Sequence, residues 1–310
     1  MQVVVRPMSE EDIEQVRTVG QRTWSDVASK DAGRKVRYPF RPREIIEAYR
    51  WKDPQGCLVA EENGVVVGSA FSHVWGGTGW IGPFEVLPEK QGHGIGTSLM
   101  QASESYLAKA GCGVMGLETM PYFLRNVHFY LRFGYTPKEM TFIMSGKELA
   151  RESQECVRRL EIEDLGHCRE RILELSRSMH PSLDLTNEVE MALNKKIGKC
   201  LVFEKRGRIG GLAVVHDFYP ADADHASLRL MLVDSQSRFQ KKIFEALLSA
   251  CEHLVKEERR KRLFVRFSST QSRVYPLLHE RSYVLEGANI RMVKGRYAEK
   301  EGYSFAAWAG

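Results

Sequence analysis

The chain repeats itself: four short blocks of its first half recur, in the same order, in its second half. Each block lies between 143 and 152 residues from its counterpart, and the differences in spacing fall in expected loops. The pairs are Val5–Ile13 with Val157–Leu165, Cys57–Glu61 with Cys200–Glu204, Val86 with Val233, and Tyr135 with Tyr283. Such repetition predicts two copies of one α/β domain, and a length of 310 residues suits two domains. We expect the copies at residues 1–147 and 154–298, followed by a tail at 299–310.

A glycine-rich turn stands between an apolar segment and a helix-like segment of the first copy. The apolar segment runs from Trp80 to Leu87, and glycines follow at positions 92, 94 and 96. Beyond them, apolar side chains recur every three or four residues, at Leu99, Met100, Ala102, Tyr106 and Leu107. A strand, a glycine turn and a helix present bare backbone N–H groups to a phosphate, and the helix N-terminus adds partial positive charge. The stretch predicts a phosphate-binding turn; the alternative is an ordinary tight turn.

Two common phosphate-binding motifs do not fit this turn. A dinucleotide-binding turn has the spacing Gly-x-Gly-x-x-Gly, whereas the third glycine comes one residue too soon here. A P-loop requires Gly-Lys followed by Ser or Thr, which the turn lacks. The pattern that fits from Val86 to Gly96 is Val-x-Pro-x-x-Gln-x-x-Gly-x-Gly. This pattern resembles the acyl-CoA signature of the GNAT superfamily of N-acyltransferases.

The resemblance extends over roughly residues 1 to 145. Strands are expected at Val3–Arg6, Cys57–Ala60, Val65–Phe71 and Val114–Thr119, and a capped helix is expected to begin near Ile13. The stretch from Tyr130 to Tyr135, with glycine before the final aromatic residue, resembles the last helix and turn of the family. The resemblance therefore implies an α/β (α+β) fold: a mixed, twisted sheet flanked by helices, in two tandem GNAT-like domains.

The resemblance also implies which residues bind the acyl donor, most simply acetyl-CoA. Main-chain groups of Phe84 and Val86 correspond to those that hold the pantetheine arm and polarise the thioester. The diphosphate corresponds to the turn formed by Gln91, Gly92, His93, Gly94, Ile95, Gly96 and Thr97. Asn126 stands four residues before Tyr130, whereas the usual asparagine of the family stands seven before it. Asn126 is therefore either a contact of the pantetheine arm or an ordinary helix residue.

Three side chains are candidates for proton transfer. In the family, the tyrosine at the position of Tyr130 often protonates the departing thiolate, and the alternative is a buried aromatic residue. The attacking amine must be neutral, so a base or a desolvated cleft must remove its proton. Glu85 lies in an apolar strand and Glu118 ends the next one, and we name both as candidate bases. The glutamate of some family members falls at Trp80, and relay through water would need no single base.

The second copy lacks the residues that carry this chemistry. The three glycines are replaced, because Arg238 to Ile243 stand where the first copy has Gln91 to Gly96. Leu278 stands at the position of Tyr130 and has no proton to donate. We expect a degenerate, non-catalytic copy. The alternative is that the basic side chains of this stretch bind phosphate directly, and these are Arg238, Lys241 and Lys242.

Composition limits the class of protein. The formal net charge is +5, with acidic and basic residues interspersed, so a nucleic-acid partner is not expected. No apolar run reaches the length of a membrane span, and the first residues lack a signal-peptide core, so we expect a cytoplasmic protein without membrane contact. Six cysteines form no Cys-x-x-Cys pair, so no metal site is expected. Monomer and homodimer both remain open.

The segment least like the family, residues 24 to 52, is the expected place for acceptor choice. It carries basic and aromatic side chains, which suit an anionic or aromatic acceptor or simply form a solvated helix face. They are Trp24, Arg34, Lys35, Arg37, Tyr38, Arg41, Arg43 and Trp51. The apolar tail, from Tyr303 to Trp308, is expected either to dock on a neighbouring domain or subunit or to be loose.

These observations predict an acyl-CoA-dependent N-acyltransferase, most simply an N-acetyltransferase. The expected acceptor is a primary amine on a small molecule or peptide, which attacks the thioester directly. An intact donor turn without an indispensable base also suits a non-catalytic acyl-CoA-binding regulatory module, and this is the alternative from another functional class.

Overall fold

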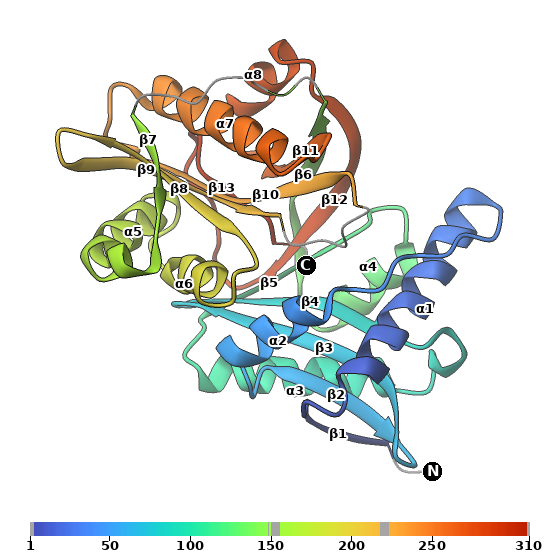
Figure 1. Cartoon of the computed structure of the whole chain (residues 1–310). Coiled ribbons are helices and arrows are strands. Elements are labelled where there is room, and N and C mark those ends of the chain that lie inside the picture. The colour runs from blue at the N-terminus through green and yellow to red at the C-terminus, as the bar shows by residue number, and fades with distance from the viewer. Residues whose placement is uncertain (1–2, 148, 150–155, 218–222, 309–310) are drawn as a thin grey trace. The chain divides into compact units, whose positions relative to one another are not determined.

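The computed structural model describes residues 3–147, 149, 156–217 and 223–308 (Figure 1). The chain divides into two compact units, one that ends at Met115 and one from Gly116 to Trp308. The boundary falls inside strand β5 (Val114–Thr119), so it does not coincide with the expected end of the first sequence copy at residue 147. The copy boundaries themselves stay a prediction.

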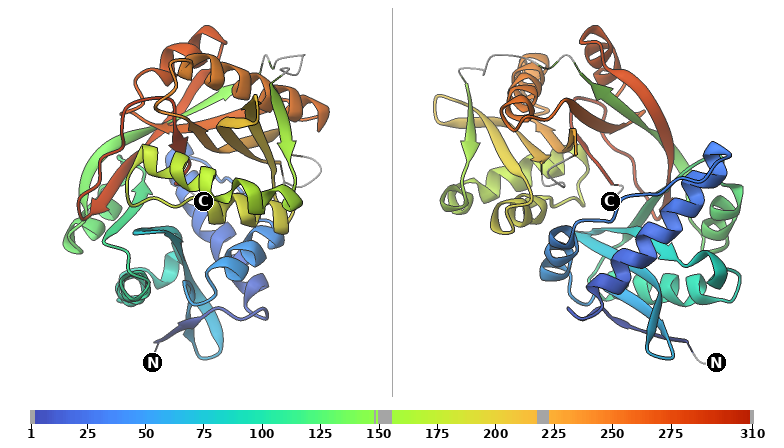
Figure 2. Two further views of the ribbon diagram at one scale, coloured as in Figure 1. Left: turned by 90° about the vertical axis from the view of Figure 1, so that its left-hand side faces the viewer. Right: turned by 45° about the vertical axis from the view of Figure 1, so that its right-hand side comes forward.

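The first unit is an antiparallel sheet with helices on both faces (Figures 1 and 2). Its strand order is β1-β2-β3-β4, with α1 and α2 on one face and α3 on the other. Every side chain of β3 from Val66 to His73 is buried, because both faces of this strand are covered. The elements are β1 Val3–Pro7, α1 Ile13–Ala32, α2 Arg43–Lys52, β2 Cys57–Glu62, β3 Val65–Trp75, β4 Thr78–Val86, η1 Pro88–Lys90 and α3 Ile95–Lys109.

The second unit is a mixed sheet in which α7 covers one face and α5 and α6 cover the other (Figures 1 and 2). Its strand order is β5-β12-β6-β11-β10-β9-β8-β7, and the short β13 pairs with β10 outside this order. The elements up to β9 are α4 Leu124–Arg132, β6 Thr136–Gly146, β7 Val157–Leu160, η2 Ile162–Asp164, α5 Leu165–Met179, α6 Thr186–Asn194, β8 Lys199–Lys205 and β9 Arg208–His216. The later ones are β10 His225–Val233, α7 Gln240–Glu257, β11 Arg262–Ser268, α8 Val274–Glu280, β12 Val284–Lys294 and β13 Phe305–Ala306.

The two sequence copies exchange their last strands. Strand β6, which closes the first copy, lies between β12 and β11 of the second copy. Strand β12, which closes the second copy, pairs antiparallel with β6 from Val284 to Val293 and has β5 as its other neighbour. With the expected copy boundaries, each copy therefore contributes one strand to the part of the sheet formed by the other. The expected fold class, a mixed sheet flanked by helices, is confirmed.

Candidate active site

The glycine turn lies between the end of β4 and the start of α3. Gly92 and Gly94 have φ values of 86° and 83°, in the left-handed region that favours glycine. A Cβ atom at either residue would meet no atom within 4 Å, so the backbone conformation and not crowding requires glycine. The side-chain amide of Gln91 donates a hydrogen bond of 3.0 Å to the carbonyl of Val86, which ties the turn back to the strand.

The backbone N–H groups of residues 92 to 97 point to no acceptor within the described part of the chain. The first amide after the turn that donates a backbone hydrogen bond is that of Ser98, to the carbonyl of Gly94 at 3.1 Å. No side chain caps the N-terminus of α3. Gly92, His93 and Gly94 are exposed. Backbone amides without partners at the positive end of a helix are groups that attract an anion, and α3 has 15 residues.

Strand β4 is irregular just before the turn. Ser72 pairs with Ile81 and Ala70 pairs with Phe84, so β4 has one more residue than β3 between these two pairs. Such a bulge bends the strand away from regular pairing. Phe84 is half-buried and Val86 is buried, and both lie beyond the bulge on the approach to the turn. The first unit thus brings together all the residues expected to hold the donor except Asn126.

Glu85, a candidate base, is fully buried and accepts four hydrogen bonds. Its carboxylate accepts hydrogen bonds from Arg41 Nη2 at 2.7 Å and from Arg41 Nη1 at 3.2 Å. Trp24 Nε1 lies 2.8 Å from one oxygen and Ser69 Oγ lies 3.3 Å from the other. Burial alone would lower the pKa of Arg41, but the nearby Glu85 charge outweighs burial and raises it.

Among the basic and aromatic residues of the segment from residue 24 to 52, some contact Glu85 and others are exposed. Trp24 and Arg41 face inward to Glu85, whereas Arg34, Lys35 and Arg37 are exposed. Sequence reasoning did not pair Arg41 with Glu85. The signal was a carboxylate in an apolar strand, which is buried only with a partner.

Glu118, the other candidate base, belongs to the second unit. One of its oxygens accepts hydrogen bonds from Thr141 Oγ1 at 2.6 Å and from Arg291 Nη2 at 3.1 Å. The other oxygen, Oε2, is buried and has no hydrogen-bond partner among the described residues. Arg291 also pairs with Glu299. One buried cation therefore joins two carboxylates, and β12 carries that cation to the side of β5.

Tyr130 and Asn126 lie on α4 in the second unit. The Tyr130 side chain is buried against Phe129, with ring centroids 5.2 Å apart, and near Tyr135. Burial raises the pKa of the Tyr130 hydroxyl above its ordinary value, so this group stays protonated at neutral pH. Asn126 is half-buried, and its N–H donates to the carbonyl of Phe123 at 2.9 Å.

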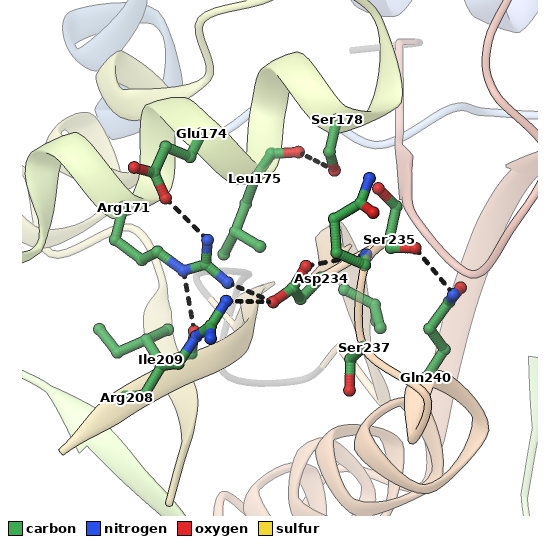
Figure 3. A network of polar contacts seen from close by, with 12 residues as sticks. Arg171, Glu174, Leu175, Ser178, Arg208, Ile209, Asp234, Ser235, Ser237 and Gln240 are labelled. Carbon is green, nitrogen blue, oxygen red and sulfur yellow. Dashed lines mark hydrogen bonds and ion pairs between the residues drawn. The ribbon is translucent and has the colours of Figure 1, made fainter. Parts of the chain in front are cut away.

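The second copy has a different arrangement after β10 (Figure 3). The carboxylate of Asp234 accepts hydrogen bonds from Arg171 at 2.6 Å and Arg208 at 3.2 Å. Burial acts to raise the pKa of Asp234, but the N–H of Gln236 and the neighbouring arginine hold it below its usual value. Arg171 and Arg208 are therefore already paired with a carboxylate of the protein. Beside this network lies a cavity of about 630 Å³, lined in part by Arg171, Ser235 and Lys300.

The basic residues proposed as an alternative phosphate site in the second copy are exposed. Lys241 lies 3.8 Å from Glu245, and the Arg238 guanidinium stacks on Phe239. Leu278, at the position of Tyr130, is fully buried in the apolar core. In the described part of the chain, no three His, Cys, Asp or Glu side chains are grouped as a metal site would require. None of the described helices is both long and apolar enough to span a membrane.

Comparisons with known proteins concern the family and the fold. Residues 24–135 match the model of the acetyltransferase (GNAT) family. No match is found among curated protein sequences. A presumed acetyltransferase from Pyrococcus horikoshii superposes with a TM-score of 0.71 at 16% identity, over 99% of this chain and 95% of its own.

Two further solved structures superpose over most of the chain. A tandem GNAT protein of the clavulanic acid biosynthesis pathway has a TM-score of 0.60 at 15% identity, over 96% of this chain and 98% of its own. N-myristoyltransferase of Saccharomyces cerevisiae, with bound myristoyl-CoA, has a TM-score of 0.68 at 13% identity, over 96% and 79%. Identities this low show a shared fold, and that fold extends over nearly the whole chain.

Proposed function

We propose that this chain, which has the GNAT fold and a GNAT-family domain at residues 24–135, transfers acyl groups from acyl-CoA to amines. The specific reaction we propose is N-acetyl transfer from acetyl-CoA to a primary amine of a small molecule or peptide. The observation that carries the proposal is the turn from Gln91 to Thr97, in which the amides of residues 92 to 97 have no acceptor within the described part of the chain, at the start of α3.

This turn suits a diphosphate in shape and charge. The space above Gly92 and Gly94 is open, and the amides around them have no competing acceptor in the described part of the chain. A hydrogen bond to a charged group is worth about 1.5–3 kcal/mol, so several together give useful affinity. Main-chain groups of Phe84 and Val86 lie on the same strand just before the turn, where a pantetheine arm would extend.

The proton transfers are assigned to the second unit. Tyr130, whose hydroxyl keeps its proton at neutral pH, is the proposed acid toward the departing thiolate. Of the two candidate bases, Glu118 has an oxygen without a hydrogen bond from any residue that the structure describes. Both oxygens of Glu85 are hydrogen-bonded within a buried ion pair, so we assign it to holding Arg41 and Trp24 in place.

The second copy is proposed to be structural. It lacks the glycines that expose the amides, it has Leu278 in place of the acid, and its Asp234 would repel a diphosphate. The exposed cations of the first unit, Arg34, Lys35 and Arg37, favour an acceptor that also carries an anionic group.

The test is release of free thiol from acyl-CoA in the presence of pooled amines, amino acids and peptides. Donors from acetyl to myristoyl chains resolve the acyl length, and acceptors with and without a carboxylate resolve the role of the exposed cations. Turnover with acetyl-CoA supports the proposal. Binding of CoA without turnover on any acceptor points to a non-catalytic binding module. Absence of CoA binding overturns both.

A further inference from the structure

The C-terminal segment from Lys300 to Trp308, called the tail segment below, adds a strand to β10 in the second unit. Leu230 pairs with Ala306 and Met231 with Phe305, in antiparallel register. The N–H of Ala307 donates to the carbonyl of Arg229 at 2.8 Å. Ser304 Oγ accepts from the N–H of Val233 at 2.9 Å and lies 3.2 Å from its carbonyl.

The tail segment fills a gap between two parallel strands. Strands β10 and β11 pair only from His225 to Leu228, and β13 takes the place of β11 beside the rest of β10. Phe305 fills the interior of this gap: its ring lies 6.1 Å from Phe267 of β11 and 6.5 Å from Phe244 of α7. The side chains from Ser304 to Trp308 are all buried, with at most 7% exposure.

The corresponding stretch of strand in the first copy is the one assigned to the donor arm. The repeat places Met231 and Val233 at the positions of Phe84 and Val86, the two residues whose main chain is assigned to the pantetheine arm. Both copies also have a strand irregularity at the matching place, between Ile81 and Phe84 in β4 and between Leu228 and Leu230 in β10. The correspondence therefore rests on geometry as well as on sequence.

The first residues of the tail segment, before β13, are also held by contacts within the second unit. Its start is fixed by Lys300, whose N–H donates to the carbonyl of Met179 at 2.9 Å. Gly302 donates its N–H to Gln271 Oε1 at 2.8 Å. Tyr303 lies on Phe244, with ring centroids 5.5 Å apart, in the first turns of α7. Phe244 corresponds to Thr97, which follows the glycine turn of the first copy, so the tail segment lies along the position of the arm and reaches the start of the helix.

From these contacts we infer that the second copy holds the tail segment as a permanent internal ligand, in the slot that corresponds to the acyl-CoA slot of the first copy. What the first copy binds rests on the proposed function. The consequence is that one chain binds one CoA, and that the second slot accepts a peptide strand of small and aromatic residues instead.

The test uses the full chain and two variants. Ser304→Ala removes the acceptor of the Val233 amide, and Phe305→Glu places a charge in the apolar gap and releases the tail segment. Leu285→Glu, at a half-exposed position of β12, is the control. We expect hydrogen exchange at the Val233 amide to rise about tenfold or more in both variants and to stay unchanged in the control.

A synthetic peptide with the sequence of residues 303–308, at roughly millimolar concentration, should restore protection of Val233 in Phe305→Glu. CoA titrated calorimetrically into the full chain should bind with a stoichiometry of one. Two CoA per chain, or unchanged exchange at Val233 in Ser304→Ala, overturns the inference. If Phe305→Glu does not fold, the Ser304→Ala result decides. Absence of CoA binding with peptide rescue intact removes the proposed function and leaves this inference standing.

Discussion

Arg41 Nη2 lies 2.7 Å from Glu85 Oε1, and the two side chains form an ion pair that is almost completely buried. Arg41 belongs to the loop before α2, and Glu85 lies near the end of β4, between the two residues assigned to the donor arm. The pair fixes this loop to the strand, and Trp24 of α1 joins it through the same carboxylate.

Removal of Arg41 is expected to destabilise the protein by about 3 kcal/mol, because it leaves the Glu85 carboxylate buried without its countercharge. Urea denaturation of Arg41→Ala measures this. Lys30→Ala, which removes an exposed pair with Asp26 on α1, should cost less than about 1 kcal/mol. The double variant Arg41→Met with Glu85→Met should recover most of the loss. A loss in Arg41→Ala no larger than in Lys30→Ala would show that the pair is not structural.

Substitution of Gly94 by alanine is expected to weaken CoA binding about tenfold or more. Its φ of 83° disfavours any side chain by about 1–2 kcal/mol, so the turn relaxes and its amides lose their common direction. Gly111, just past the other end of α3, has a φ of 84° and equally open surroundings. Gly111→Ala should therefore lose similar stability in thermal melts and keep its CoA affinity by calorimetry. Equal CoA affinity in the two variants would show that the glycine turn does not bind the donor.

Local patterns in the sequence were sufficient for several elements of the first sequence copy. The expected strands at 57–60, 65–71 and 114–119 are observed as Cys57–Glu62, Val65–Trp75 and Val114–Thr119, and the periodic segment after Gly96 is helix α3. These elements follow from alternation, helical spacing and glycine conformations, which depend only on near neighbours. The glycine turn, with its two positive φ values, belongs to the same class.

Pairings over long distances could not be predicted. Arg291 bonds Glu118 across 173 residues, and β12 pairs with β6 although each closes a different sequence copy. A repeat predicts that two copies exist, but it does not predict that they exchange strands. The exchanged strands occupy equivalent positions in the repeat, so the sequence pattern of each strand fits the sheet of either copy. The tail is a further case: its apolar composition predicts burial, whereas its position beside β10 depends on a gap formed by distant residues.

Tyr130→Phe is expected to reduce turnover about 10²-fold or more while CoA affinity stays within a factor of two, because only the hydroxyl is removed. Since burial raises the pKa of this hydroxyl, the rate should show no decline from its ionisation below about pH 10. Tyr122→Phe, an exposed tyrosine before α4, is the control and should leave the rate unchanged. Unchanged turnover in Tyr130→Phe would mean that the thiolate leaves without this acid.

His216 makes the folded state sensitive to mild acid. Burial and the nearby Arg229 lower the pKa of this side chain from 6.5 to about 3, against an opposing effect of Glu188. The unfolded chain therefore takes up a proton below pH 6.5 that the folded chain refuses. Stability should fall as the pH decreases from 6.5 toward 3, by about 1.4 kcal/mol per pH unit, or about 2 kcal/mol at pH 5.

His216→Gln removes the proton site and should flatten this part of the pH profile of urea denaturation, even if it lowers stability at pH 7. His93→Gln, in the exposed glycine turn, should keep the wild-type slope. The slope difference between the two variants is the decisive quantity, because other buried groups that titrate in this range contribute equally to both. A wild-type slope in His216→Gln would place the acid sensitivity in the carboxylates instead.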